Sequence, residues 1–153
     1  MINSVTFWDR LRAADHEFEG SDCVISITDP DKLECSINGT NNVLRLAFHD
    51  VIEVIRMADI TMVPMLRHQA VAIVQQLQAW QEDGIAHNVI VHCEAGASRS
   101  AAVALYVYAY TGCKFVTLGA ATYANSYIIE KFRQVSPMQL GANWHIELLN
   151  DYL

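Results

Sequence analysis

A chain of 153 residues is expected to fold as a single domain, residues 1–153, with a hydrophobic core of its own. Its 52% hydrophobic and 18% charged residues are typical of a globular protein and not of a disordered one. The net charge of -7, with only ten basic residues, argues against nucleic acid as a partner, because that role needs a dense field of Lys and Arg.

The sequence also indicates a location for the protein. No uninterrupted apolar stretch approaches the length of a transmembrane helix, and the acidic first segment does not resemble a secretory signal. The cysteines show neither a Cys-x-x-Cys pair nor a disulfide-type spacing, and no histidine has metal-ligand spacing; the cysteines are Cys23, Cys35, Cys93 and Cys113. We therefore expect a cytoplasmic protein that requires no metal or cofactor and does not bind membranes.

Two strands are predicted in the first third of the chain. Cys23–Thr28 is a short apolar run that ends at the turn residues Asp29 and Pro30, which indicates a buried strand. A turn rich in Asn and Gly then leads to a second strand, Val43–Phe48.

A helix and a third strand are predicted next. Pro64 is suited to the first helical position, and Gly84 lies just beyond the expected end of the helix. Between them the apolar residues recur at helical spacing and form one face, made of Leu66, Ala70, Ile73, Val74, Leu77 and Trp80. The run Val89–Val91 is apolar without alternation, as expected for the middle of a parallel sheet that is covered on both faces.

Helices dominate the remainder of the predicted structure. Ala101–Tyr110 is apolar on all sides, which indicates a buried helix, and Gly112 is suited to end it. A further helix is predicted from about 115 to 132, and a last one over Trp144–Tyr152. Strands that alternate with helices predict an α/β fold, a layered domain with a central, mostly parallel sheet flanked by helices.

The segment between the third strand and the buried helix contains the candidate catalytic residues. From His92 to Ser100 it has the sequence His-Cys-Glu-Ala-Gly-Ala-Ser-Arg-Ser. A loop at such a junction directs backbone N–H groups into one concavity, and the helix dipole adds positive potential, so the loop can hold a phosphate. Arg99 can grip two phosphate oxygens. The predicted substrate-binding residues are Glu94, Ala95, Gly96, Ala97, Ser98 and Ser100.

Cys93 stands at the start of this loop and is the candidate nucleophile. The positive potential that would hold a phosphate also stabilises a thiolate. A thiolate can attack phosphorus in line and form a covalent thiophosphate, and the hydroxyl of Ser100 can donate to the sulfur as it leaves. No other cysteine of the chain has an arginine at the same offset.

At these residues the chain resembles the cysteine-based protein tyrosine phosphatases, and among them the compact dual-specificity type. The family pattern His-Cys-x-x-Gly-x-x-Arg-Ser/Thr is matched at each fixed position, by His92, Cys93, Gly96, Arg99 and Ser100. The resemblance covers residues 23 to 112, and the tail is similar to that of small bacterial members. It implies that Cys93 and Arg99 are catalytic and that the substrate carries phosphotyrosine, or phosphotyrosine and phosphoserine or phosphothreonine alike.

The resemblance also implies a carboxylic acid that protonates the leaving oxygen. Asp50 follows the strand Val43–Phe48, where the family has its acid, but it lies 43 residues before Cys93, farther than in compact relatives. Asp59 lies 34 residues before Cys93, which is closer to the family distance. We favour Asp50, because the end of a strand constrains geometry more than loop length does, and Asp59 is the alternative. The long segment between Asp50 and the next helix is typical of a lid.

Other functions fit the same residues. A phosphatase fold with a misplaced acid would be a pseudophosphatase, a module that binds phosphorylated partners. A small non-protein phosphate ester is an alternative substrate, whereas Glu94 and the absence of Lys in the loop disfavour phosphoinositides and RNA. A sulfur- or arsenate-handling enzyme would also place an oxyanion above a thiolate, but Cys93 has no second cysteine near it in the sequence. The sequence leaves the physiological substrate and the oligomeric state open.

Overall fold

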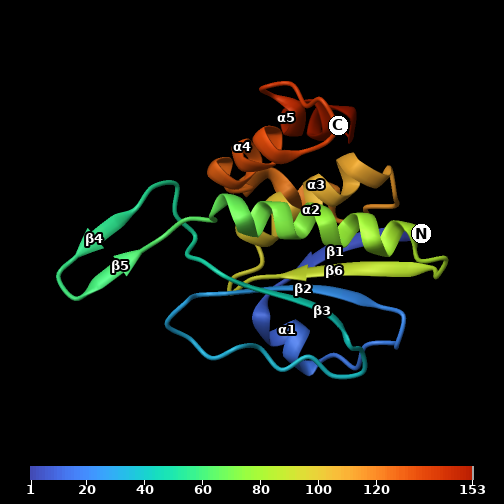
Figure 1. Cartoon of the computed structure of the whole chain (residues 1–153), viewed down its shortest axis with the longest axis horizontal. Helices are drawn as coiled ribbons and strands as arrows, with labels where there is room; N and C mark the ends of the chain where they lie inside the picture. Colours follow the sequence, from blue (N-terminus) through green and yellow to red (C-terminus); the bar gives the residue numbers. More distant parts are fainter. Residues whose placement is uncertain (153) are drawn as a thin grey trace.

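Four parallel strands form the central sheet of the computed structural model, which describes residues 1–152 (Figure 1). Across the sheet they follow the order β1 (Ile2–Trp8), β6 (His87–His92), β2 (Cys23–Thr28) and β3 (Asn42–Ala47). Both neighbours of β6 and the pair β2–β3 run parallel. The predicted α/β fold with a parallel sheet is therefore confirmed. Because all four strands point the same way, the segments that follow them meet at one edge of the sheet.

Helices cover both faces of this sheet. On one face lie α2 (Arg67–Glu82), α3 (Arg99–Thr111), α4 (Ser126–Val135) and α5 (Trp144–Tyr152), whereas the short α1 (Arg10–Asp15) lies on the other (Figure 1). The main core forms between the sheet and α2 to α4, and a smaller cluster around Phe18, Val24 and Ile90 fills the opposite face. Within residues 1–152, no helix is long and apolar enough to cross a membrane.

The buried helix predicted after the candidate loop is confirmed. Nine consecutive residues of α3, from Arg99 to Val107, are buried. Small side chains at Ala101, Ala102 and Ala104 let the helix approach the sheet closely, and α4 stacks Phe132 on Tyr106 at a ring distance of 4.2 Å. Gly112 ends the helix in the left-handed conformation with a φ of 66°, which an L side chain rarely adopts. The start of this helix is therefore held rigidly by the core.

Two predicted helices have different bounds in the structure. The helix expected from Pro64 begins at Arg67, because Leu66 is still extended and its N–H donates to Gln69 Oε1 (2.8 Å). The helix expected from about 115 to 132 is wrong as one element. It consists of a 3₁₀ helix, η1 (Leu118–Tyr123), and of α4, because Asn125 caps a new helix by accepting from the N–H groups of Tyr127 and Ile128.

Two further features were not predicted. The edge strand β1 places Ile2, Val5 and Phe7 in the core. The long segment after β3 contains an antiparallel hairpin, β4 (Ile55–Met57) and β5 (Ile60–Met62), that projects from the body of the molecule (Figure 1).

Candidate active site

The candidate loop, residues 93–98, joins the end of β6 to the start of α3 at the edge where all four strands end. We call it the Cys93 loop. Gly96 in this loop has a φ of 69°. A Cβ there would lie 2.4 Å from the backbone nitrogen of Asp9 and 2.6 Å from the carbonyl carbon of Trp8. Only glycine fits without moving the β1–α1 connection, so the loop is tightly folded against the end of β1.

The sulfur of Cys93 is surrounded by hydrogen-bond donors. The side chain is buried, its Sγ accepts from the N–H of Gly96 (3.2 Å), and the hydroxyl of Ser100 lies 3.2 Å away. The start of a thirteen-residue helix, α3, lies directly behind the loop. A thiolate in this position would face an N–H dipole, a hydroxyl and the positive end of the helix.

The other three cysteines have a different environment. Burial, with a smaller contribution from the charge of Asp83, raises the pKa of Cys23 to about 12. Burial also raises the pKa of Cys35 and Cys113 above the ordinary thiol value. Thiolates are therefore scarce at these three positions near neutral pH, and none of them suits a nucleophile.

His92 holds the backbone of the nucleophile. Its Nδ1 lies 3.1 Å from the carbonyl oxygen of Cys93, and its Nε2 lies 2.6 Å from Ser26 Oγ. Burial lowers the pKa of His92, so the ring is neutral near pH 7. Because a carbonyl can only accept, Nδ1 carries the proton and Nε2 accepts from the Ser26 hydroxyl. The His92 ring thus positions the backbone of Cys93 through a hydrogen bond to its carbonyl oxygen.

Arg99 is fixed on one side and free on the other. Its Nη1 donates to Asp29 Oδ1 (2.7 Å) and to the carbonyl oxygen of Phe48 (2.6 Å), at the ends of β2 and β3. Its Nε is buried and has no hydrogen-bond partner among residues 1–152. A buried N–H of a charged group is costly to leave unpaired, so this edge of the guanidinium is suited to an oxygen ligand.

Asp29 has a role that sequence reasoning missed. It was assigned to the turn after β2, yet its carboxylate also anchors Arg99. Burial opposes the charge of Asp29, but the hydrogen bond and the charge of Arg99 outweigh it and hold the pKa of Asp29 below its ordinary value. Asp29 and Arg99 are 70 residues apart, so no local sequence pattern could indicate that they pair.

Glu94 is bound by basic residues from two other connections. Its Oε1 accepts from Arg10 Nη1 (3.0 Å), its Oε2 lies 3.8 Å from Lys32 Nζ, and its carbonyl oxygen accepts from the N–H of Arg10 (3.2 Å). Neither Arg10 nor Lys32 was predicted to lie at the site. The exposed Ala95 and Ala97 have only methyl side chains, so only their backbone N–H groups can bind phosphate oxygens.

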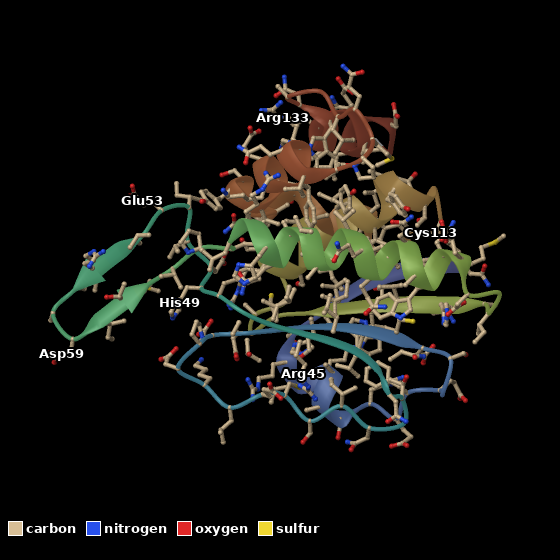
Figure 2. All side chains as sticks on the ribbon, viewed as in Figure 1. Arg45, His49, Glu53, Asp59, Cys113 and Arg133 are labelled. Carbon is tan, nitrogen blue, oxygen red and sulfur yellow. The ribbon has the colours of Figure 1, made fainter. Side chains whose placement is uncertain are left out.

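The two candidate acids lie in different places. Asp50 Oδ1 accepts from Ser98 Oγ (2.8 Å) and from Asn125 Nδ2 (2.8 Å), so Asp50 lies against the Cys93 loop. Asp59 lies in the turn between β4 and β5, at the outer end of the hairpin (Figure 2). The structure therefore brings Asp50 and Ser98 together, and it adds Asn125, which the sequence did not single out. In residues 1–152, His, Cys, Asp and Glu side chains form no group suited to a metal ion.

Comparison with known proteins gives a similarity of fold only. No protein-family model and no curated protein matches the chain. Among solved structures, a mouse candidate dual-specificity phosphatase in complex with zinc tungstate matches with a TM-score of 0.44 and 13% identity, over 97% of this chain and 80% of that one. Tk-PTP in its active form matches with a TM-score of 0.43 and 16% identity, over 96% and 89%. Scores below 0.5 do not assign an activity.

Proposed function

We propose that this chain is a phosphomonoester hydrolase that works through a cysteinyl-phosphate on Cys93. The preferred substrate is phosphotyrosine in a protein, or phosphotyrosine and phosphoserine or phosphothreonine alike. One observation supports this most strongly. The Cys93 sulfur, held between the Gly96 N–H and the Ser100 hydroxyl, begins the same short loop that ends at the buried guanidinium of Arg99, whose Nε has no partner within residues 1–152.

In the first step the thiolate of Cys93 attacks phosphorus, so that a P–S bond forms and the bond to the leaving oxygen breaks. Backbone N–H groups of the loop and the free edge of Arg99 would hold the phosphoryl oxygens. Asp50 gives its proton to the leaving oxygen. Its Oδ1 already accepts two hydrogen bonds, so Oδ2 is the oxygen that carries this proton.

In the second step a water molecule attacks the phosphorus, the P–S bond breaks, and inorganic phosphate is released. The Asp50 carboxylate takes the proton from the attacking water, which restores the acid for the next cycle. The sulfur regains its negative charge as it leaves. Ser100 Oγ, 3.2 Å from Sγ, donates a hydrogen bond to that developing charge.

A module that binds phosphorylated partners and turns over slowly is the second candidate. The contacts of Asp50 with Ser98 and Asn125 favour it, because they occupy one carboxylate oxygen and hold the side chain against the loop. Asp50 would have to reach the leaving oxygen from that position. Rapid turnover of a substrate with a basic leaving group, such as phosphotyrosine, separates the enzyme from the binding module.

The proposal is tested with para-nitrophenyl phosphate and a panel of phosphopeptides, phospholipids and nucleotides. We expect acid-quenched wild-type protein to carry covalent phosphate, detected by mass spectrometry on the peptide that contains Cys93. Cys93→Ser should abolish turnover and still bind inorganic phosphate in calorimetry, because the binding groups are backbone N–H and Arg99. Wild-type turnover in this variant would exclude the covalent mechanism.

A further inference from the structure

The β4–β5 hairpin has one apolar face and one polar face. Its strands pair residue by residue, and directly paired side chains point to the same side of a hairpin while successive ones alternate. The polar face presents Arg56 and Thr61. The other face, which we call the apolar hairpin face, is made of Ile55, Met57, Ile60 and Met62.

The outer part of this face is mostly exposed to solvent. Met57 is 61% exposed and Ile60 is 57% exposed, and Ile52 and Val54 in the same segment are more than half exposed as well. A two-stranded hairpin with strands of three residues is marginally stable unless it packs against something. A cluster of exposed apolar side chains in one projecting element is typical of a binding surface.

The base of the hairpin is attached directly beside the Cys93 loop. The N–H of His49 donates to the carbonyl oxygen of Val63 (2.7 Å), and the N–H of Val63 donates to His49 Nδ1 (3.0 Å). The residue after His49 is Asp50, which contacts Ser98 of the loop. Figure 2 shows His49 where the hairpin joins the body of the molecule. The position of the hairpin is therefore fixed relative to the proposed phosphate site.

A cavity of about 310 Å³ lies between the hairpin and the rest of the chain. On the hairpin side it is lined by Asp59, Ile60 and Thr61, of which Ile60 belongs to the apolar hairpin face and Thr61 to the polar face. On the other side it is lined by Pro30, next to Asp29, and by His49, next to Asp50. Pro30 and His49 are next to Asp29 and Asp50, which contact Arg99 and the Cys93 loop, so the cavity lies between the proposed phosphate site and the hairpin, which it touches at Ile60.

We propose that the apolar hairpin face and this cavity dock the polypeptide of a phosphorylated protein while its phosphate is held in the Cys93 loop. This inference rests on the proposed function. A small phosphate ester ends within the loop, whereas a polypeptide extends about 3.3 Å with each further residue and can reach the cavity and the hairpin. Asp31 and Asp59 also line the cavity, so the adjacent side chain of the substrate is neutral or basic.

The size of the face also favours a substrate over a second copy of this chain. Four apolar side chains bury on the order of a few hundred Å², below the roughly 800 Å² that each partner contributes to a standard stable interface. A face of this size suits a ligand whose remaining affinity comes from elsewhere. For a phosphorylated protein, that remainder is the phosphate in the loop.

The test compares a double variant, Met57→Ser with Ile60→Ser, with the wild type. The substrates are para-nitrophenyl phosphate and peptides with a central phosphotyrosine or phosphothreonine flanked on both sides. We expect kcat/KM for the peptides to fall by about tenfold or more, mainly through KM, and kcat/KM for the small ester to stay unchanged. Ile85→Ser is the matched control, because Ile85 is 51% exposed and precedes β6 at the end of the strand opposite the loop.

Equal peptide rates in the double variant and the wild type would overturn the docking inference and leave the proposed function intact. If the wild type hydrolyses no substrate, the proposed function fails, and the docking inference is then tested by peptide binding to Cys93→Ser. If Met57→Ser and Ile60→Ser weaken peptide binding to Cys93→Ser, the docking inference is supported. If binding is equal with and without them, the docking inference is overturned. The inference is also wrong if ultracentrifugation shows a wild-type dimer that these substitutions convert to a monomer.

Discussion

Arg99 is the residue at which the sheet, the loop and α3 meet. Its Nη1 donates hydrogen bonds to the Asp29 carboxylate and to the carbonyl oxygen of Phe48, whereas Nε has no partner within residues 1–152 and can bind a ligand. We predict that Arg99→Lys lowers kcat/KM for phosphotyrosyl peptides by roughly 10²–10³, because an ammonium cannot reach the anchor and the phosphate together. Steady-state kinetics measure this loss. Arg133→Lys is the control, because Arg133 forms an exposed ion pair with Glu130 on α4. A small effect at Arg99 would show that Nε does not face the phosphate.

The four cysteines provide a second prediction at the scale of single residues. Iodoacetamide at neutral pH should modify Cys93 first, because burial raises the pKa of the other three thiols, to about 12 for Cys23. Phosphate or vanadate should protect Cys93 by occupying the loop. Mass spectrometry of proteolytic peptides gives the rate at each position. Faster labelling of Cys35 or Cys113 would contradict the assignment of the nucleophile.

At the scale of elements, the segment between β3 and α2 contains both candidate acids. We predict that Asp50→Ala slows hydrolysis of tyrosyl phosphates by roughly 10²–10⁴, the usual contribution of a general acid. An activated nitrophenyl phosphate should lose much less, because its leaving group is stable as an anion. Rates measured across a series of leaving groups test this.

Asp59→Ala is the matched variant for that prediction. Asp59 lies at the turn of the hairpin and lines the cavity between the hairpin and the rest of the chain. Its replacement should therefore have a mild effect on the rate of hydrolysis that does not depend on the leaving group. If Asp59→Ala instead shows the strong leaving-group dependence, the acid comes from the hairpin, and the contact of Asp50 with Ser98 is structural.

At the scale of the whole molecule, the pair Asp29–Arg99 joins the end of β2 to the start of α3. Burial by itself raises the pKa of Asp29, but the hydrogen bond and the charge of Arg99 lower it by a larger amount. The pKa of Asp29 in the folded state therefore lies below the unfolded value of about 3.9. The pair therefore adds stability at pH values above the unfolded pKa, and this stability is lost as the pH falls through the folded pKa.

Asp29→Asn should accordingly lower the free energy of unfolding by about 2 kcal/mol at neutral pH, less than for a fully buried pair. The difference from the wild type should shrink as the pH falls below about 4. Urea unfolding followed by circular dichroism from pH 7 to pH 3 measures it. A difference that persists in acid would mean that packing, not charge, explains the loss. Glu130→Gln, at an exposed pair with Arg133, should have little effect at any pH.

The local pattern of apolar residues was sufficient for much of the fold. The strand Cys23–Thr28 and the buried helix after Arg99 follow from runs of side chains that can only be stabilised by burial. The loop between β6 and α3 was predictable for the same reason, since a strand, a glycine and an apolar helix stand next to each other in the sequence. The edge strand β1 was missed, although Ile2, Val5 and Phe7 are buried, because its apolar residues do not strictly alternate.

The sequence alone thus determined the type of fold and the position of Cys93 and Arg99 at a strand–loop–helix junction. Only the tertiary structure decided which distant groups approach that junction. Asp29 meets Arg99 across 70 residues, and Asn125 meets Asp50 across 75. These contacts depend on the order β1–β6–β2–β3, which brings the ends of all four strands to one edge. Burial patterns encode local structure, whereas hydrogen bonds between distant polar side chains arise only once the sheet has placed their segments together.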